Sequence, residues 1–492
     1  MQRYQLYIDG QDVDPQDGVW FESHNPYTGE PWAEIPRGGQ ADVDRAVRAA
    51  DRAMREGPWA EMTASERGRL IHRLGDLIAR EADRLAELEV RDNGKLIAEM
   101  AGQVKYLPQY YYYFGGLADK IEGAVLPLDK KGYLAYTRYE PVGVVAAITP
   151  WNSPLLLMTW KVAPALAAGC SVVVKPSEFT SASTLVFARL FEEAGFPPGV
   201  FNVVTGYGAE VGSPLVEHPL VKKVSFTGSD VTGKRINEQA AGQLKHTAME
   251  LGGKSANVVF ADADLEQAVF GAISGIFAAS GQTCIAGSRL LLHEDIYDAF
   301  VEKLIDVASQ ARMGDPMDPE TQVGPVTTPA QYQKILDYIE IAGGEGAKLL
   351  MGGGKPTRED IADGWFLEPT IFGDVRGDMR IAQEEVFGPV LSIIRFADEA
   401  EAVRIANDVR FGLAAAVWTR DMARAIRMTE KLEAGTVWVN TYRAVSFMAP
   451  FGGVKDSGLG RENGQDAIYE FLQTKSVWIN AGVTSGNPFV LR

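Results

Sequence analysis

The feature of this sequence that most restricts its fold is an alternation of short β-branched runs with helical segments, which begins near residue 142. The first series predicts strands over 142–148, 172–175, 200–204 and 223–226, with helices such as 181–193 and 230–239 between them. The second series predicts strands over 256–260, 289–293, 390–396, 414–419 and 436–440, with helices such as 296–311 and 421–432. Such alternation is typical of parallel sheets covered by helices. The sequence therefore predicts an α/β fold with two parallel-sheet domains.

The segments outside these two series carry other patterns. The N-terminal part is predicted to be helical, because residues 42–54 place valines and alanines on one face. Thr63 and Glu66 form a capping-box pattern that predicts a long helix toward Val90. Residues 128–139 are predicted to form a hairpin with its turn near Lys131 and Gly132, and 475–479 a late strand. Exposed edge strands pair readily with another chain, so both segments are candidates for oligomerisation.

Size and composition narrow the function classes. A chain of 492 residues is too long for one compact core, so two or three domains are expected. Apolar residues make up 46% and charged residues 23%, as in an ordinary soluble enzyme. The net charge of −17, without a cluster of Lys and Arg, argues against binding nucleic acid or anionic membranes.

Cysteine and histidine usage narrows the setting further. Two cysteines, Cys170 and Cys284, are too few for a disulfide framework, which favours a reducing, cytoplasmic location. The first ten residues lack the apolar run of a signal peptide, and the weakly polar stretch 268–279 is too short to span a bilayer. The five histidines show no ligand spacing, so no metal site is predicted.

Two segments at strand ends suggest a nucleotide site. In Phe226-Thr227-Gly228-Ser229-Asp230-Val231-Thr232-Gly233, Gly228 permits a tight turn and Ser229 can meet a phosphate at a helix N-terminus. The spacing G-x-x-x-x-G also fits an ordinary βα turn, and the rival segment 206–212 fits a loop. After the strand ending at 175, Lys175 and Glu178 can both reach ribose hydroxyls, and the acid would favour NAD over NADP. The alternative is a solvated charge pair.

Three residues suggest covalent catalysis through sulfur. Cys284 lies in a glycine-flanked polar bend, where nearby backbone amides would ease ionisation of the thiol. Glu250 ends an apolar strand, where a raised pKa would suit a general base. Asn152, in Pro150-Trp151-Asn152-Ser153-Pro154, could steady an oxyanion. The alternatives are a small buried cysteine, a helix-capping or surface acid, and a turn asparagine. Cys170, between Ala-Ala-Gly and a valine run, is assigned to the core.

Seven motifs in order give the chain a resemblance to the NAD(P)-dependent aldehyde dehydrogenase superfamily over nearly its whole length. They are PWNSP (150–154), KPSE (175–178), FTGS (226–229), MELGGK (249–254), GQTC (281–284), EEVFGP (384–389) and PFGGVK (450–455). The resemblance implies that Cys284 attacks the aldehyde carbonyl, that Asn152 and the Cys284 amide hold the oxyanion, and that Glu250 activates the water that hydrolyses the thioester. Lys161 and Glu462 match positions proposed to pass protons from Glu250.

The resemblance also implies a cofactor site and an architecture. It places Lys175 and Glu178 on the adenine ribose, Ser229 near the pyrophosphate, Glu385 at the nicotinamide ribose and Phe387 beside the ring. Backbone at Thr149, Trp151 and Gly208 would line the cleft. NAD is the expected cofactor, and NADP is possible. It implies a dinucleotide-binding domain over 1–120 and 142–252, a catalytic domain over 253–470, and an oligomerisation arm over 121–141 and 471–492. The expected assembly is a homodimer or homotetramer.

The chain departs from better-known members of this superfamily along the expected substrate tunnel. Ser153 stands where many have an aromatic residue, and Val445 is also small, while Trp160 and Phe451 remain as aromatic walls. Arg443 replaces a frequently acidic residue near the tunnel mouth, which favours substrates with a distal carboxylate or polar oxygen. The alternative is a solvated loop arginine. Tyr110-Tyr111-Tyr112-Tyr113 would either line the tunnel or pack a helix.

The leading prediction is an NAD-dependent aldehyde dehydrogenase that releases a free acid, and three other functions are its alternatives. An acylating enzyme, which transfers the acyl group to coenzyme A, would lack a general base at position 250. A cysteine hydrolase needs no dinucleotide. It would therefore leave four nucleotide-site residues without a role: Lys175, Glu178, Ser229 and Glu385. A non-catalytic scaffold would not be expected to keep Cys284, Glu250 and Asn152 together.

Overall fold

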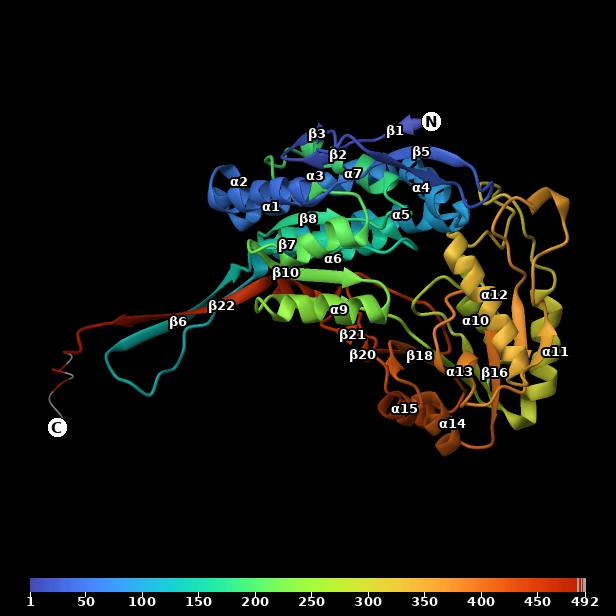
Figure 1. Ribbon diagram of the computed structural model, residues 1–492. Helices are drawn as coiled ribbons and strands as arrows, with labels where there is room; N and C mark the ends of the chain where they lie inside the picture. Colours follow the sequence, from blue (N-terminus) through green and yellow to red (C-terminus); the bar gives the residue numbers. More distant parts are fainter. Residues whose placement is uncertain (485, 488, 490–492) are drawn as a thin grey trace.

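The computed structural model describes residues 1–484, 486–487 and 489, and confirms the predicted α/β architecture. Figure 1 shows two sheet-and-helix bodies and a thin two-stranded arm that projects away from them. None of the helices in these described residues is long and apolar enough to cross a membrane.

The first sheet has eight strands, and its middle is parallel. Its order is β21 (Gly458–Leu459), β11 (His246–Glu250), β10 (Val221–Thr227), β7 (Val144–Ile148), β8 (Ser171–Lys175), β9 (Phe201–Val203), β2 (Leu6–Ile8) and β3 (Gln11–Val13). From β7 the chain winds outward through β8 and β9, and then returns to add β10 and β11 on the other side of β7. The winding direction therefore reverses between β7 and β10, and such switch points are where open α/β sheets bind ligands.

Alternation along β7 explains why helices cover both faces of this sheet. Val144, Ala146 and Ile148 pack with α1 (Gln40–Arg55), α8 (Ser213–Glu217) and α9 (Asp230–Ala241). Val145 and Ala147 pack on the other side, which is covered by five helices. These are α3 (Ala64–Arg80), α4 (Ala82–Asn93), α5 (Ile97–Leu117), α6 (Pro154–Ala168) and α7 (Ala182–Ala194). Because successive side chains of a strand point to opposite faces, this all-apolar strand must be covered twice.

The second sheet has seven strands and the same construction. Its order is β14 (Lys348–Met351), β15 (Thr370–Gly373), β16 (Val390–Phe396), β13 (Arg289–His293), β12 (Ala256–Val259), β18 (Ala414–Trp418) and β19 (Thr436–Val439), with only β14 antiparallel. One face carries α10 (Leu265–Ile276) and α11 (Tyr297–Ala308). The other carries α12 (Pro329–Gly344), α14 (Glu399–Asn407) and α15 (Met422–Lys431). The five strands predicted in this series are confirmed.

Two expectations for the N-terminal part are wrong. The helix predicted over 42–54 is confirmed as α1, but the first 36 residues contain strands instead of helices, namely β1 (Gln2–Arg3), β2, β3, β4 (Trp20–His24) and β5 (Pro31–Pro36). The helix predicted from Thr63 toward Val90 is two helices, because the chain breaks at Glu81 between α3 and α4. The capping box itself is present, since the Thr63 hydroxyl accepts from the Glu66 amide and the Glu66 carboxylate accepts from the Thr63 amide.

The arm consists of β6 (Tyr133–Pro141) and β22 (Leu472–Asn480), paired antiparallel over their full lengths. The late strand is confirmed, but the main partner of β6 is this distant segment rather than residues just before it. A short return remains, because Val125 forms a bridge with Tyr136 on the other edge of β6. Figure 1 shows β6 and β22 lying side by side as they leave the first sheet.

Candidate active site

The carboxyl ends of four neighbouring parallel strands place most of the predicted site residues along one edge. Ile148 at the end of β7 is in register with Lys175 on one side and with Phe226 on the other. Thr227, at the end of β10, is in register with Glu250 at the end of β11. The loops that follow β7 and β10 therefore face each other across the switch point, which makes this edge the expected ligand crevice.

A cavity of about 140 Å³ occupies this crevice and reaches Cys284. The loop after β7 contributes Pro150, Trp151 and Asn152, the turn after β10 contributes Thr227, Gly228 and Ser229, and the end of β11 contributes Leu251 and Gly252. The second body closes the cavity with Cys284, Gln331, Lys334, Glu385 and Phe387. The cavity therefore lies between the two bodies, and Cys284 is the cysteine that lines it.

Cys284 lies in a turn that the preceding residues hold in an unusual conformation. Ala279 and Ser280 both have positive φ values, of 53° and 52°. Gln282 is fully buried, and its side-chain oxygen accepts from the Thr327 amide at 2.9 Å. Cys284 itself is partly exposed, whereas Cys170 is buried in the core as predicted. Strained backbone conformations next to an accessible thiol are typical of functional sites.

The expectation that backbone amides ease ionisation of Cys284 is outweighed in this structure. Burial, with the neighbouring carboxylates of Glu385 and Glu250, raises the pKa of the Cys284 thiol to about 12. Hydrogen bonds from backbone amides lower this pKa, but their effect is smaller than that of burial and the two carboxylates. A reactive thiolate at this position needs a change in its surroundings, for example a bound cation or displacement of a carboxylate.

Asn152 is buried, and its side-chain amide donates to the backbone carbonyl of Gln282 at 2.9 Å. This hydrogen bond ties the loop after β7 directly to the loop that carries Cys284. An asparagine amide has two N–H groups, so one remains to be offered to an oxyanion. The position is compatible with the predicted role.

Glu250 is 4% exposed, and among the described residues neither of its carboxylate oxygens has a hydrogen-bond partner. Burial and the nearby Glu462 carboxylate raise the pKa of Glu250 well above its usual value. Gly452, with φ +156°, lies so close that a β-carbon there would come within 2.8 Å of the Glu250 carboxylate. An unpartnered buried carboxyl with a raised pKa is suited to take a proton from water.

Lys161 and Glu462 form a buried ion pair beside Glu250. The Lys161 ammonium donates to Glu462 at 2.5 Å and to the Thr227 hydroxyl at 2.7 Å. Lys161 is on α6, and Glu462 is in the chain that returns to the first sheet through β21. Because Glu462 also raises the pKa of Glu250, the three groups form one electrostatic unit.

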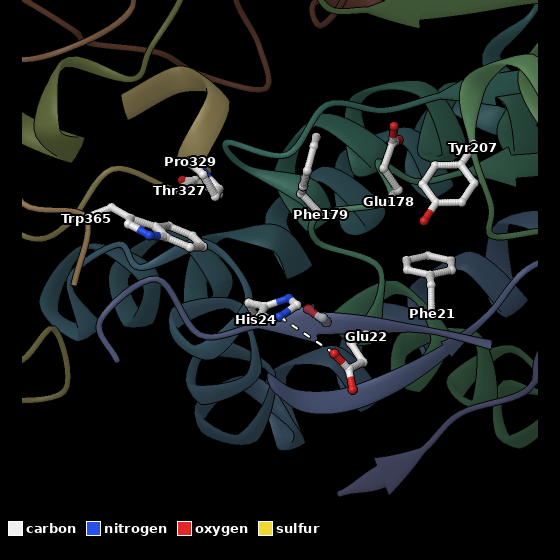
Figure 2. Close-up of a pocket in the computed structure, with 10 residues that line it drawn as sticks. Phe21, Glu22, His24, Glu178, Phe179, Tyr207, Thr327, Pro329 and Trp365 are labelled. Carbon is white, nitrogen blue, oxygen red and sulfur yellow. Dashed lines mark ion pairs between the residues drawn. The ribbon is translucent and has the colours of Figure 1, made fainter. Parts of the chain in front are cut away.

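Lys175 and Glu178 form the ribose-side pair predicted from the sequence. The Lys175 ammonium is buried and donates to the Pro176 carbonyl at 2.9 Å and to the Glu178 carboxylate at 3.2 Å. Glu178 also lines a hollow of about 330 Å³, away from Cys284, which Figure 2 shows between the N-terminal strand β4 and loops of both bodies. The rings of Tyr207 and Phe21 face each other there, with centroids 5.3 Å apart.

The turn between β10 and α9 has the geometry expected of an anion site. Ser229 is the N-cap of α9, and its hydroxyl accepts from the Thr232 amide. A β-carbon at Gly233 would come within 2.3 Å of Leu251, so this glycine lets α9 pack onto the end of β11. Gly208 begins a π-helical turn over Gly208–Gly212, and Thr149 is buried with its amide bonded to the Lys175 carbonyl at 3.1 Å.

Glu385 and Phe387 approach the cavity from the second body. The Glu385 carboxylate accepts from the Gly253 amide at 2.9 Å, and burial raises its pKa. Phe387 has φ 60° and its ring meets Trp151 edge-on, with centroids 5.2 Å apart. Gln331 on α12 donates to the Phe387 carbonyl at 3.0 Å and so fixes this segment. Gln331 carries no motif from which this contact could be predicted.

Aromatic side chains pack together around Trp160 on α6 and Tyr110 on α5. Trp160 packs against Phe451 with ring centroids 5.0 Å apart and against Tyr110 at 6.4 Å. Tyr110 also meets Phe447, which the sequence analysis missed although it lies two residues after Val445. The four consecutive tyrosines diverge, as expected from their helical spacing: Tyr111 packs on Phe187, Tyr112 bonds Asp76, and Tyr113 meets Phe447.

The remaining tunnel candidates differ in accessibility. Ser153 is buried, and its hydroxyl contacts the ammonium of Lys95, a residue that the sequence analysis also missed. Val445 is 36% exposed. Arg443 has φ 65°, and one of its guanidinium nitrogens donates to the Ser274 carbonyl at 3.1 Å.

The residues present fit a dinucleotide. The crevice is at the sheet's switch point, α9 directs its N-terminus into it, and Lys175 and Glu178 stand at the neighbouring strand end. Glu385 and Phe387 would hold the end nearest Cys284.

Comparisons with known proteins agree with this geometry. The model of the aldehyde dehydrogenase family matches residues 13–477. A (Z)-2-((N-methylformamido)methylene)-5-hydroxybutyrolactone dehydrogenase of Acinetobacter baylyi is 47% identical over the full length of both chains. A betaine aldehyde dehydrogenase of Staphylococcus aureus, solved with NAD+, has a TM-score of 0.98 and 41% identity, covering 99% of this chain and 97% of its own. An aldehyde dehydrogenase of Bacillus cereus, also solved with NAD+, gives 0.95 and 44%, covering 98% and 97%.

Proposed function

This chain belongs to the aldehyde dehydrogenase family, and we propose that Cys284, Asn152 and Glu250 are the residues with which it performs the family's reaction. The enzyme oxidises an aldehyde to a carboxylic acid through a cysteine, with NAD+ as cofactor. The observation that carries the assignment is the cavity at the switch point, which ends on a partly exposed thiol flanked by a buried asparagine amide and a buried carboxyl.

The chemistry follows from what each side chain can do. The Cys284 thiolate adds to the aldehyde carbon, and the resulting oxyanion of the thiohemiacetal is held by the Asn152 amide and the Cys284 backbone N–H. NAD+, when bound, accepts the hydride, which leaves a thioester on Cys284. Glu250 takes a proton from water, the water attacks the thioester, and the acid leaves while the sulfur regains its proton.

Lys161 and Glu462 are proposed to carry the proton away from Glu250. The support is their direct ion pair and the electrostatic coupling of Glu462 with Glu250. The Lys161 ammonium also offsets the charge of the buried Glu462 carboxylate.

We propose that the substrate is an aldehyde with a distal carboxylate, bound by Arg443. The support is that Arg443 lies two residues before Val445 and that its guanidinium makes one side-chain hydrogen bond among the described residues, to the Ser274 carbonyl. The A. baylyi relative is named for a 5-hydroxybutyrolactone. In chemical terms, ring opening of a 5-hydroxybutyrolactone gives an aldehyde with a carboxylate at the other end, so an acidic aldehyde suits Arg443.

The finer organisation is also a proposal. Residues 1–120 and 142–252 would form the cofactor-binding domain, 253–470 the catalytic domain, and 121–141 with 471–492 an arm that joins copies into a homodimer or homotetramer. The exposed apolar side chains of the arm, such as Trp478 and Ile479, support pairing with another copy. The two cysteines are unpaired, which supports a reducing cytoplasm.

The test is NADH formation with a panel of neutral, amino and carboxylate-bearing aldehydes. Wild type should prefer carboxylate-bearing members by kcat/KM, and Cys284→Ser should abolish turnover of all of them. Arg443→Ala should lower the ratio of kcat/KM for acidic over neutral aldehydes by roughly tenfold. An unchanged ratio would remove Arg443 from substrate recognition, and turnover by Cys284→Ser would overturn the catalytic assignment.

A further inference from the structure

Lys95 is a buried ammonium that the reaction scheme above does not use. It follows the C-terminus of α4, is 3% exposed, and its Nζ lies 2.9 Å from the Ser153 hydroxyl oxygen. The titratable groups that face it are Glu89 on α4, Glu99 on α5, Arg443 and Cys284. Among the described residues Lys95 forms no ion pair within 4.0 Å. The two acids are engaged elsewhere, because Glu89 accepts from the Leu155 amide and Glu99 from the Ala279 amide, both at 2.8 Å.

The Lys95 contact fixes the direction of the Ser153 hydroxyl group. Burial lowers the pKa of Lys95 to about 8, so at neutral pH its side chain is mainly an ammonium. An ammonium can only donate hydrogen bonds, so the Ser153 oxygen is then the acceptor and the hydroxyl hydrogen must be directed elsewhere. Within the described part of the chain, the structure gives that hydrogen no protein acceptor, because the Lys95 contact is the one side-chain hydrogen bond of Ser153. A buried donor without an acceptor is costly, so a ligand oxygen at this point would be favourable.

Ser153 is also at the reacting end of the site. It directly follows Asn152, whose amide holds the Cys284 loop, and it is the N-cap residue of α6, which carries Trp160 and Lys161. Lys95 is near enough to Cys284 for its charge to act on a thiolate formed there. Ser153 is therefore next to the groups that hold and face the Cys284 loop.

We propose that Ser153, fixed as a hydrogen-bond donor by Lys95, binds an oxygen one or two carbons from the reacting carbonyl, so that the enzyme selects aldehydes oxygenated near the aldehyde group. Ser153 is a specificity-determining residue in this account, and Lys95 is a positioning residue that acts through it. The inference rests on the proposed attack by Cys284 and names a feature of the substrate next to its aldehyde group.

The experiment compares aldehydes of equal length that differ by one oxygen. Methoxyacetaldehyde is matched with butanal, and 3-methoxypropanal with pentanal, each with saturating NAD+. For wild type, kcat/KM should be higher for at least one ether aldehyde than for its hydrocarbon match. Ser153→Ala should lower that ether-to-hydrocarbon ratio roughly fivefold to tenfold, the value of one hydrogen bond. Ser309→Ala, a surface serine on the second body, is the matched control.

Two further variants separate positioning from a merely structural effect. Lys95→Met should lower the same ratio, because the Ser153 hydroxyl can then rotate, and Lys95→Arg should restore most of it. In the double variant Ser153→Ala/Lys95→Met the ratio should fall no further than in Ser153→Ala. Because the readout is a ratio, general loss of stability or activity cancels.

A ratio that is near one in wild type, or that Ser153→Ala leaves unchanged, overturns the inference. Failure of the proposed mechanism looks different, since Cys284→Ser would then still oxidise butanal and pentanal. The two failures are therefore distinguishable on the same protein preparations.

Discussion

At the scale of single residues, burial sets the protonation of the two groups that must react. The Cys284 thiol has a pKa raised to about 12, and the Glu250 carboxyl has a pKa raised well above its usual value. Each carboxylate near the thiol makes the thiolate less favourable, and each loss of solvent contact does the same. The free enzyme therefore keeps its nucleophile protonated until substrate and cofactor change the site.

This arrangement predicts the pH dependence of thiol alkylation. Iodoacetamide reacts with the thiolate, so in the free enzyme the rate at Cys284 should keep rising with pH above pH 9. Glu250→Gln removes a negative charge that raises the thiol pKa, so the rise should move to lower pH. Peptide mass spectrometry measures the site, and buried Cys170 serves as an internal control that stays unmodified. A profile that moves to higher pH in Glu250→Gln would contradict the electrostatic account.

Glu178 gives a second prediction at this scale. A carboxylate beside the ribose repels a 2′-phosphate, so Glu178→Gln should raise kcat/KM with NADP relative to NAD by roughly tenfold. The measurement is initial rates with both cofactors and one aldehyde. If the ratio does not rise, Glu178 does not contact the ribose hydroxyl.

Single residues were predicted well where the sequence carries their local setting. The end of an apolar strand was enough to place Glu250 in a buried site, and the valine run after Cys170 to place that cysteine in the core. Lys95 and Phe447 were missed because their roles depend on contacts across the chain, with Ser153 and Tyr110. The thiol pKa was misjudged because the local amides are visible in sequence, whereas the carboxylates of Glu385 and Glu250 arrive through folding.

At the scale of elements, the turn between β10 and α9 combines a structural and a binding role. Ser229 caps α9, so Ser229→Ala should cost about 1 kcal/mol of stability and also weaken NAD binding, because the helix N-terminus then loses part of its order. Asp398→Ala is the matched control, since Asp398 caps α14 through the Glu401 amide and lies outside the cavity.

Thermal unfolding and an NAD titration of both variants measure the two effects. The account expects similar losses of stability in both variants and a weaker affinity for NAD only in Ser229→Ala. If both variants bind NAD as wild type does, the phosphate site is not at this turn.

Strands buried on both faces were the easiest elements to predict, because their apolar runs are continuous, as in 289–293 and 390–396. The strands β2 and β3 were missed because each has three residues, too short to show a period. The break at Glu81 was missed because α3 and α4 continue the same helical pattern, and only the packing of each helix shows the change of direction.

At the scale of the whole molecule, the arm exposes large apolar side chains that a single chain does not cover. Trp478 and Ile479 on β22 are 52% and 44% exposed, on a two-stranded ribbon that leaves the body (Figure 1). The pairing of β6 with β22 joins residues more than 300 apart, which local sequence signals do not predict. A β-ribbon of two strands is marginal alone, so a second copy is its expected support.

Trp478→Asp should therefore weaken self-association by roughly tenfold or more, the value of burying one large apolar side chain. Light scattering across a range of protein concentrations measures the mass. Met422→Asp is the control, because Met422 is 72% exposed on α15 in the second body. Equal masses for Trp478→Asp and wild type at every concentration would exclude the arm as the interface.

The central claim is that Cys284 forms an acyl intermediate and that Glu250 serves only to hydrolyse it. The most direct test is rapid mixing of Glu250→Gln with NAD+ and an aldehyde from the panel that the wild-type enzyme oxidises. The account predicts a burst of about one NADH per active site, followed by a steady rate lower than wild type by about 10²–10⁴-fold. Mass spectrometry should find the acyl group on Cys284. Absence of the burst, with no acyl group on Cys284, would contradict the account.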